Sequence, residues 1–525
     1  TRLKVAIDIF HCAIQLQCAR ILAIVPTPSY SHQIPFRALW LELNKRGHEI
    51  VFVSPIPIPN LNLTNFTQID VGETFRSREK IDFIKLRFEQ QSWNTYLEDY
   101  LLDVIDMITE NVFNNTEMQK LYAPNNSGAK FDVVFVELLY TSALNYHYDQ
   151  SRVLRMIIGV TSLGVTAFNE YVLGGLVIPS HDNTWEMEAR IGSNLSFWKR
   201  LENYLVLWRH IYLYYHNFAP RQQKLAEKYL GTDIPSVLDI QKNTSVLFVN
   251  QANVIASARP RLANMITFSS IHVDKNPKSL PKDLKRFVDE ATEGFVYFSL
   301  GSNAMSSDMP RETLQVFLDV FAKLPYKVVW KFEKELPEKP DNVFIGPWFP
   351  QQSILAHPNI KMFIYQGGLQ SSEEAVHFTV PLLGLPVLAD QDYQVRRMEA
   401  LGFLDVTLGD NDKICLLATT FICDCFRYKE NMIKLRSMMN DNPYDLIKHL
   451  AWWTEYVIRY KGTPHLYSNL AHQPWYQYCD MDVVIFLTIV IFTVLYSVLC
   501  IIAKISKYLC KQPRTSSRNK KQKFS

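Results

Sequence analysis

A strand, a pair of glycines and a helix follow one another in the second half of the chain. Residues 359–365 form a short apolar run of strand length, Gln366, Gly367 and Gly368 come next, and a helical pattern begins near Gln370. The first turn of a helix carries unpaired N–H groups and a partial positive charge, and glycines have no side chain to keep a ligand from the backbone. The segment therefore predicts a pocket for a phosphate or pyrophosphate.

Strands and helices also alternate through the rest of the chain. Near the N-terminus, residues 21–26 form an apolar strand, residues 32–46 an amphipathic helix that ends at Gly47, and residues 49–54 a second strand. Further strands are expected at residues 132–137, 155–161, 295–300 and 327–331, and further helices at residues 92–111, 198–228, 310–324, 390–401, 413–439 and 444–460. This alternation favours an α/β fold, in which helices cover both faces of a parallel sheet.

The chain is long enough for two such units. Its 525 residues exceed what one hydrophobic core normally supports. A Pro- and Lys-rich passage interrupts the alternation, which is typical of a linker. We therefore expect an N-terminal lobe at residues 19–273, a linker at residues 274–290 and a C-terminal lobe at residues 291–445. Both lobes would be doubly wound and Rossmann-like, facing each other across a cleft.

Composition and charge exclude other classes. A formal net charge of only +3 gives no reason to expect a nucleic-acid partner. The eight cysteines are too sparse for a disulfide scaffold, and Cys423 and Cys425 lack metal-ligand spacing. Two Asp-x-Asp strings, residues 410–412 and residues 480–482, lie in a predicted loop and beside an apolar segment, so we interpret both as solvated acids. No metal is expected.

The N-terminal half carries signs of secretory entry. Residues 1–18 have a basic start and a mostly apolar run, which predicts part of a signal peptide. Six Asn-x-Ser/Thr sequons lie before residue 250, at Asn62, Asn65, Asn114, Asn125, Asn194 and Asn243. We expect this half of the chain to be a lumenal glycoprotein.

The C-terminal end predicts a membrane anchor. Residues 483–503 carry no charge, and a helix of that length spans a hydrocarbon core of about 30 Å. The tail at residues 504–525 holds eight Lys or Arg and no acid, so it should be cytosolic. Lys521 and Lys523 resemble a dilysine signal for retrieval to the endoplasmic reticulum, and the alternative is a basic tail attracted to anionic lipid. We expect a single-pass type I protein of that membrane with a lumenal body.

Four motifs in fixed order give a more specific signal. They are Trp348-x-Pro350-Gln351, Leu355-x-His357-Pro358, Gly367-Gly368-x-x-Ser371-x-x-Glu374-Ala375, and Val380-Pro381 through Asp390-Gln391. Together they resemble the signature of membrane-bound UDP-glucuronosyl and UDP-glucosyltransferases. The family usually has His at the place of Gln366, and arthropod members often have Gln there. The resemblance implies the two-lobed GT-B fold, with a late helix in residues 446–482 that crosses back onto the first lobe.

The resemblance also implies how the UDP-sugar is held. Trp348 would stack on uracil, Gln351 would bond to the nucleoside, and Glu374 would accept bonds from the ribose hydroxyls. Asp390 and Gln391 would bind sugar hydroxyls, a task suited to a carboxylate beside an amide. The remaining donor-binding residues, chiefly around the phosphates, would be Ser299, Gly301, Ser302, Arg259, Gln366, Gly367, Gly368, Gln370 and Ser371.

The same resemblance points to a catalytic base. His32 follows the first strand at the start of the first helix, where the family places its catalytic His, and imidazole can deprotonate an alcohol near neutral pH. Relatives orient this His with an Asp, and Glu137 stands at the matching position. Asp132 is the second choice for that partner. His48, in a helix stop and turn, is expected to be structural.

These features predict a metal-independent, inverting UDP-glycosyltransferase that needs no cofactor and conjugates a small lipophilic alcohol or phenol, as in detoxification. The arthropod-like Gln366 favours UDP-glucose over UDP-glucuronate. The alternatives are a specialised lipid or steroid glycosyltransferase and a lumenal pseudoenzyme that binds UDP-sugar without turnover; homo- or hetero-oligomers stay open. The acceptor pocket is expected among residues 80–215, where Tyr96, Phe168, Tyr171 and Trp185 are candidate lining residues.

Overall fold

The computed structural model divides the chain into two compact units, Thr1–Ala471 and His472–Ser525. It describes residues 18–80, 82–89, 102–122, 130–139, 142–145, 156–178, 185, 195–387, 389–402, 404–405 and 427–511. Several predictions lie outside these ranges: the leader at residues 1–17, the sequons at Asn125 and Asn194, Tyr96, residues 406–426 with Asp410, Asp412, Cys423 and Cys425, and the tail beyond residue 511.

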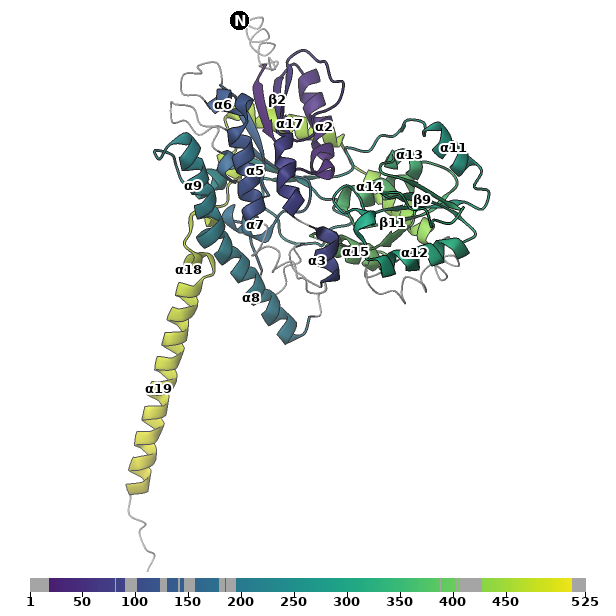
Figure 1. Cartoon of the computed structure of the whole chain (residues 1–525). Helices are drawn as coiled ribbons and strands as arrows, with labels where there is room; N and C mark the ends of the chain where they lie inside the picture. The colour runs from purple at the N-terminus through teal and green to yellow at the C-terminus, as the bar shows by residue number, and fades with distance from the viewer. Residues whose placement is uncertain are drawn as a thin grey trace, which may run out of the picture. The chain divides into compact units, whose positions relative to one another are not determined.

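The first lobe is built on a seven-stranded parallel sheet with the order β3-β2-β1-β4-β5-β6-β7 (Figure 1). Its strands are β1 (Arg20–Ile24), β2 (Glu49–Ser54), β3 (Phe66–Asp70), β4 (Val133–Glu137), β5 (Met156–Thr161), β6 (Val246–Asn250) and β7 (Met265–Phe268). Its helices are α2 (Tyr30–Lys45), α3 (Phe83–Phe88), α5 (Leu102–Asn114), α6 (Thr116–Tyr122), α7 (Ala167–Val172), α8 (Phe197–Leu213), α9 (Ala219–Leu230) and α10 (Val237–Lys242). The predicted parallel α/β architecture is confirmed.

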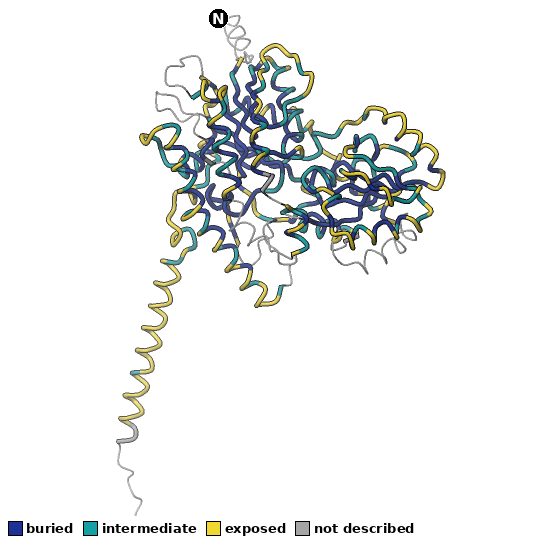
Figure 2. The backbone as a smooth tube through the Cα atoms, in the orientation of Figure 1, coloured by how far each residue is buried: buried dark blue, intermediate teal, exposed yellow. Residues whose placement is uncertain are grey.

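Two hydrophobic cores lie on opposite faces of this sheet. Successive residues of a strand point to opposite faces, so Leu22 and Ile24 of β1 enter one core while Ile21 and Ala23 enter the other. Helices α5, α9 and α10 cover the first face, and α2 covers the second. The buried strands form the dark centre of the lobe in Figure 2.

A late helix completes the second of these cores. Helix α17 (Leu446–Tyr460) packs against α2, and its residues Leu450, Ala451 and Val457 are buried there with Trp40. Asp445 caps the helix by accepting a bond from the Lys448 N–H. The chain therefore returns to the first lobe after the second, as the family resemblance implied.

The second lobe is built on a six-stranded parallel sheet with the order β10-β9-β8-β11-β12-β13. The strands are β8 (Phe295–Ser299), β9 (Lys327–Lys331), β10 (Val343–Gly346), β11 (Ile360–Tyr365), β12 (Leu382–Gly384) and β13 (Leu404–Asp405). The helices are α11 (Lys282–Asp289), α12 (Arg311–Lys323), α13 (Gln351–Leu355), α14 (Leu369–Phe378) and α15 (Gln391–Ala400), and residues 427–440 are also helical. The predicted strand, glycine pair and helix are β11, Gly367-Gly368 and α14.

The predicted linker at residues 274–290 is too long. Helix α11 occupies nearly half of it, and its Leu284 and Val288 are buried in the core of the second lobe beside Phe295. These residues are four apart and therefore lie on one face of a short helix. The second lobe accordingly begins before residue 291.

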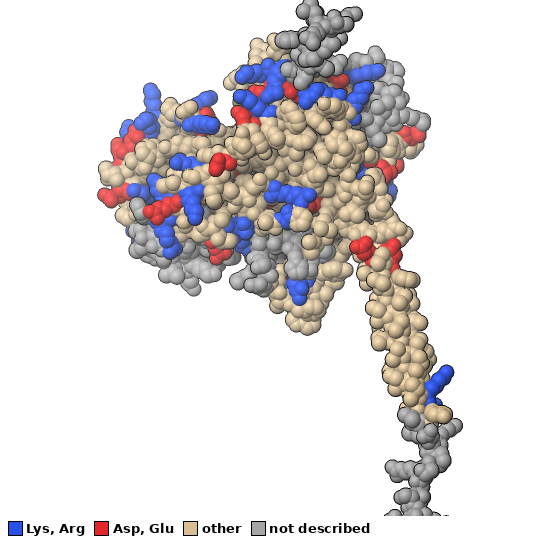
Figure 3. Space-filling view, turned by 180° about the vertical axis from the view of Figure 1, so that it is seen from behind, with Lys and Arg blue, Asp and Glu red and all other residues tan. Residues whose placement is uncertain are grey.

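The C-terminal unit contains α18 (Trp475–Tyr478) and α19 (Met481–Lys511). Among the described residues, α19 is the one helix long enough and apolar enough to cross a membrane. Its side chains are exposed along its length (Figures 2 and 3), with Asp482 in the first turn and Lys504 and Lys507 near the other end. Asp480 lies just before the helix.

Candidate active site

A cavity of about 670 Å³ lies between the two lobes. The first lobe lines it with the β1–α2 loop, the start of α2 and parts of α3 and α5, and the second lobe lines it with the ends of β8 and β9 and the starts of α13, α14 and α15. These segments follow the carboxyl ends of parallel strands, which is where α/β sheets bind their ligands. The cavity is the candidate active site.

His32 and Glu137 meet at the wall formed by the first lobe. His32 Nδ1 lies 2.7 Å from Glu137 Oε1, and the Glu137 side chain is 1% exposed. The other carboxylate oxygen, Oε2, accepts bonds from Thr27 Oγ1 at 2.6 Å and the Thr27 N–H at 3.3 Å. Both oxygens of the Glu137 carboxylate therefore have partners. His32 contacts Glu137 through Nδ1, so Nε2 is the ring nitrogen that remains to face a ligand.

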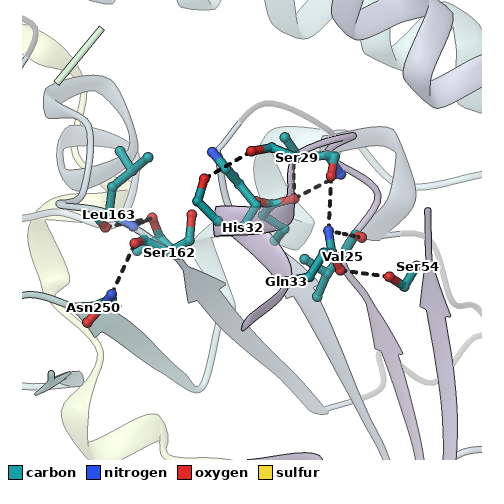
Figure 4. Close-up of polar contacts among 12 residues, drawn as sticks. Val25, Ser29, His32, Gln33, Ser54, Ser162, Leu163 and Asn250 are labelled. Atoms are coloured by element: carbon teal, nitrogen blue, oxygen red, sulfur yellow. Dashed lines mark hydrogen bonds and ion pairs between the residues drawn. The ribbon is translucent and has the colours of Figure 1, made fainter. Parts of the chain in front are cut away.

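Gln33 fixes the start of α2, which carries His32. Its amide donates to the carbonyl oxygens of Val25 and Thr27 and accepts a bond from Ser54 Oγ at 2.8 Å. Figure 4 shows Gln33 pointing to this side, while Ser162, Leu163 and Asn250 lie on the other side of His32. The helix start is thus bound to two strands, which restricts the position of the imidazole.

Asp132 and His48, the two other titratable residues considered near the base, make contacts that stabilise the fold. Asp132 accepts a bond from the Arg20 N–H at 2.8 Å at the entrance of its strand, and it does not line the cavity. His48 is buried, accepts a bond from the Ala19 N–H at 3.2 Å and lies 3.6 Å from Glu455. Glu137 is therefore the carboxylate that contacts His32.

Trp348 projects into the cavity at the other lobe. Its side chain is 56% exposed although it is a large apolar residue, and its ring makes an edge contact with Tyr30 at a centroid distance of 5.5 Å. Lys331 Nζ lies 5.9 Å from the ring centroid and 2.5 Å from Glu333. An open indole face of this kind can stack on a planar base.

The structure joins Gln351 and Glu374 directly. Gln351 Nε2 donates to Glu374 Oε2 at 2.7 Å and to Ser371 Oγ at 3.0 Å, and Gln352 Nε2 donates to Glu374 Oε1 at 2.9 Å. An ionised carboxylate has about four lone-pair sites, so Glu374 can still accept bonds from a ligand. Both glutamines come from the first turn of α13, directly after Pro350.

The start of α14 faces the cavity without a side-chain cap. Gly368 is its N-cap and makes no side-chain bond, so the first N–H groups of the helix are available to an anion. Gly367 has φ +92°, and a Cβ there would lie 2.6 Å from Val395 and 2.8 Å from the Gln391 carbonyl oxygen. Gln370 Nε2 donates to the Ser162 carbonyl oxygen of the other lobe at 2.7 Å.

Residues after β8 lie opposite this helix. The Gly301 N–H donates to Ser299 Oγ at 3.2 Å, and the hydroxyls of Ser302 and Ser29 both donate to Asn303 Oδ1. A Cβ on Gly301 would lie 2.2 Å from Gln366 Nε2, so the glycine allows Gln366 to approach this turn. Ser29 comes from the first lobe, and its bond to Asn303 at 3.1 Å crosses the cleft.

Asp390 and Gln391 lie at the start of α15, six and seven residues beyond β12 rather than directly at a strand end. Burial raises the pKa of Asp390 to about 6, although a bond from Gln394 and the nearby His32 both lower it. Gln391 Oε1 accepts a bond from the Val387 N–H at 2.8 Å, which holds the loop before the helix. Both residues line the cavity.

Arg259 and two of the predicted aromatics lie outside the cavity. Arg259 Nη2 is 2.8 Å from the buried carboxylate of Glu170, and Arg259 lines a separate small pocket. Phe168 stacks on Tyr214, and Tyr171 packs in the core of the first lobe. Trp185 does line the cavity, with its Nε1 donating to the Gly164 carbonyl oxygen.

The structure adds residues that the sequence did not suggest. Thr27 fixes Glu137, Gln352 holds Glu374, and His272 lies against Glu374 from the segment between the lobes. The pair of glutamines after Pro350 was the one local sequence pattern that could have pointed to Gln352. His272 has no motif around it.

Comparison with solved structures gives the class of fold. The chain is similar to the glycosyltransferase of kitacinnamycin, with a TM-score of 0.55 at 15% identity over 84% of this chain and 100% of the other. Two parallel α/β lobes of this kind define the GT-B class of glycosyltransferases.

Sequence comparison then gives the family. The description "UDP-glucoronosyl and UDP-glucosyl transferase" matches residues 20–515. The chain is 32% identical to UDP-glycosyltransferase UGT5 of Dactylopius coccus over 93% of each chain. It is 30% identical to the ecdysteroid UDP-glucosyltransferase of Spodoptera littoralis nuclear polyhedrosis virus, over 90% of this chain and 95% of the viral protein. The chain belongs to the UDP-glycosyltransferase family and is an enzyme of sugar transfer from UDP-sugars.

Proposed function

We propose that this enzyme transfers glucose from UDP-glucose to a hydroxyl of a small lipophilic acceptor, with inversion and without a metal. One observation carries the proposal: the cavity that contains the His32–Glu137 pair also contains Trp348, Gln351, Glu374 and the open start of α14.

In this mechanism His32 Nε2 takes the proton of the acceptor hydroxyl as its oxygen attacks the anomeric carbon. The bond from that carbon to the UDP oxygen breaks, and UDP leaves with the electron pair. Glu137 keeps Nδ1 protonated and stabilises the imidazolium that forms, because its carboxylate lies 2.7 Å away. Direct displacement at an α-linked donor gives a β-glycoside.

The departing pyrophosphate needs positive charge in this mechanism. The first N–H groups of α14 and the N–H groups after β8 would supply it, together with the partial charge of the helix end. Trp348 would stack on uracil, and Glu374 would accept bonds from the ribose. Asp390 and Gln391 would bind the hexose, next to His32.

The charges around the cavity support a neutral hexose. Two of the lining cations already have partners: Arg37 donates to the Ile56 carbonyl oxygen, and Lys331 contacts Glu333. Asp390 would repel the carboxylate of a glucuronate when it is ionised. The viral relative is also named a glucosyltransferase.

The acceptor half of the cavity supports a lipophilic partner. Its lining residues from the first lobe are mostly apolar and include Ile34, Leu41, Phe83, Val104, Ile105, Ile108 and Trp185. A specialised steroid acceptor is the second candidate, because the viral relative is named for ecdysteroids. A pseudoenzyme is disfavoured by the intact contact between His32 and Glu137.

The experiment is transfer by the full chain in detergent, with labelled UDP-glucose, UDP-glucuronate and UDP-galactose offered separately to pooled phenols and steroids, with and without EDTA. The proposal expects transfer chiefly from UDP-glucose, unaffected by EDTA and abolished in His32→Ala. Transfer only from UDP-glucuronate, or only without EDTA, would contradict the donor or the metal part. UDP binding without transfer from any donor would favour the pseudoenzyme.

Location has its own test. We propose an endoplasmic-reticulum glycoprotein with a lumenal body, anchored by α19. Asn62 and Asn114 are exposed, so their sequons are available to a glycan. In microsomes, the chain should lose mass on treatment with endoglycosidase H, and the body should resist added protease until the vesicles are opened. Protease sensitivity in sealed vesicles would place the body in the cytosol.

A further inference from the structure

A buried histidine lies between two carboxylates behind the nucleotide end of the cavity. His272 Nδ1 is 3.6 Å from Glu373 Oε2, and His272 Nε2 is 3.4 Å from Glu374 Oε1. The three side chains are 1%, 0% and 6% exposed. Neighbouring residues of α14 supply both carboxylates, whereas the histidine comes from the segment that joins the lobes. The transfer mechanism above makes no use of this histidine.

The charges in this cluster depend on one another. Burial alone would lower the pKa of His272, but the nearby Glu374 and Glu373 carboxylates raise it above the ordinary value. Burial raises the pKa of Glu373 to about 7 against the effect of His272. His377, a turn further along α14, has its pKa lowered by burial and then by Arg436 and Lys275. The imidazole therefore favours its charged form.

Gln352 links the backbone around His272 to the same carboxylate. Gln352 Nε2 donates both to Glu374 Oε1 at 2.9 Å and to the His272 carbonyl oxygen at 3.4 Å. Gln352 Oε1 accepts a bond from the Asp274 N–H at 2.8 Å. Ser270, just before the histidine, has φ +56°, which non-glycine residues seldom adopt. The segment between the lobes is thus connected to Glu374 Oε1 both directly, by the His272 side chain, and through Gln352.

We propose that His272 is a positioning residue for the nucleotide: as an imidazolium between Glu373 and Glu374, it holds the Glu374 carboxylate aimed at the ribose and connects that carboxylate to the segment between the lobes. The inference rests on the proposed function, which assigns Glu374 to the ribose. His272 does not contact the reacting atoms, so its loss should weaken nucleotide binding more than turnover.

Removal of the cation leaves the Glu374 carboxylate beside a second carboxylate without a positive charge between them. In His272→Gln the glutamine fills similar space but carries no charge, so nothing offsets the repulsion between the neighbouring carboxylates of Glu373 and Glu374. Glu374 is then held less firmly in position and accepts ribose bonds less well. In the double variant His272→Gln with Glu373→Gln this repulsion is gone, so Gln351 and Gln352 can hold Glu374 in position.

The test is calorimetric binding of UDP and 2′-deoxy-UDP to the full chain in detergent between pH 6 and 8. We expect wild type to prefer UDP, and His272→Gln to lose about tenfold in UDP affinity and most of that preference. The double variant should regain UDP binding to within about threefold of wild type. Turnover at saturating donor should change by less than about twofold, and His377→Gln is the matched control on the same helix.

Two outcomes would overturn the proposal. They are a folded His272→Gln that keeps the full preference for UDP, and a double variant that binds no better than the single one. The proposed role of Glu374 fails separately if Glu374→Gln binds UDP and 2′-deoxy-UDP as wild type does.

A second variant tests the cluster if His272→Gln does not fold. Glu373→Gln leaves His272 paired with Glu374 alone, so UDP affinity at pH 7 should stay within about twofold of wild type. The raised pKa of Glu373 makes its contribution to stability present at low pH and lost as the pH rises through about 7. Melting temperatures of Glu373→Gln should therefore fall less than those of wild type between pH 5 and 7. Loss of UDP binding in this variant would contradict the proposal.

Discussion

Arg87 and Asp392 form a two-bonded ion pair that joins the lobes. Arg87 Nη1 lies 3.1 Å from Asp392 Oδ2, and Nη2 lies 3.3 Å from Oδ1. Helix α3, which carries Arg87, also places Ile84 in the core of the second lobe. Asp392 directly follows Gln391 in α15, so the pair holds the predicted sugar-binding end of that helix against the first lobe.

We expect Arg87→Ala to weaken donor binding through this contact. A partly exposed ion pair contributes up to about 1 kcal/mol, so the KM for UDP-sugar should rise roughly two- to fivefold with little change in kcat. Lys285→Ala breaks an exposed pair with Asp289 inside one lobe and is the control. The exchanged variant Arg87→Asp with Asp392→Arg should recover part of the loss. Equal KM values in all variants would exclude a role for the pair.

The contact between His32 and Glu137 predicts how substitutions of these two residues lower the rate of sugar transfer. His32→Ala removes the base and should lower kcat about 10²- to 10⁴-fold while UDP affinity stays within about twofold. Glu137→Gln removes the charge that stabilises the imidazolium, so it should also lower kcat, and Glu137→Asp should be intermediate because its side chain is one methylene shorter. Asp132→Asn is the control. Single-turnover rates decide, and an unchanged rate in His32→Ala would make another residue the base.

Alanine substitutions at Gly367 and Gly231 distinguish the effect of backbone strain from the effect of a local steric clash. Both have positive φ, so alanine at either position should cost about 1 kcal/mol or more of stability. A Cβ at Gly231 has nothing within 4 Å, whereas at Gly367 it would meet the Gln391 carbonyl oxygen. Gly367→Ala should therefore also raise the KM for UDP-sugar at least about tenfold. Wild-type KM in a folded Gly367→Ala would contradict this account.

The buried carboxyl of Asp390 predicts a pH effect on sugar binding. Its pKa is raised to about 6, so it is charged at pH 7 and gains a proton as the pH falls through 6. The protonated form accepts fewer bonds, so affinity for UDP-glucose should fall between pH 7 and 5 while affinity for UDP changes less. Asp390→Asn should bind UDP-glucose with a flatter pH profile. Parallel titrations of both ligands by calorimetry measure this, and identical pH profiles for the two would argue against sugar contact.

The sequence predicts the sheets better than the connections. Strands such as β1 and β8 are uninterrupted apolar runs, because both faces of a parallel sheet are buried, and these runs are visible without any tertiary information. Helix α11 was missed because its apolar positions, chiefly Leu284 and Val288, stand in a stretch rich in Lys and Asp. The composition of so short a helix reflects its exposed face and does not reveal which residues are buried.

Within the site, motif residues were predictable and their partners were not. Gln351 and Glu374 come from one signature, but the structure bonds them to each other, which no spacing rule indicates. Arg259 was placed at the pyrophosphate, yet Glu170, about ninety residues earlier, binds it elsewhere. An ion pair between distant segments depends on the fold and leaves no local pattern.

The return of α17 has a consequence for synthesis on the ribosome. The core of the first lobe includes Leu450 and Val457, so it cannot close until the whole second lobe has been made. Until then the surface of α2 that packs against α17 stays uncovered, although most of its own lobe has already emerged. The first lobe should therefore be the part of the nascent chain that needs a chaperone for the longest time. Any shorter form of the chain that ends before residue 446 would lack α17 and should need the chaperone permanently.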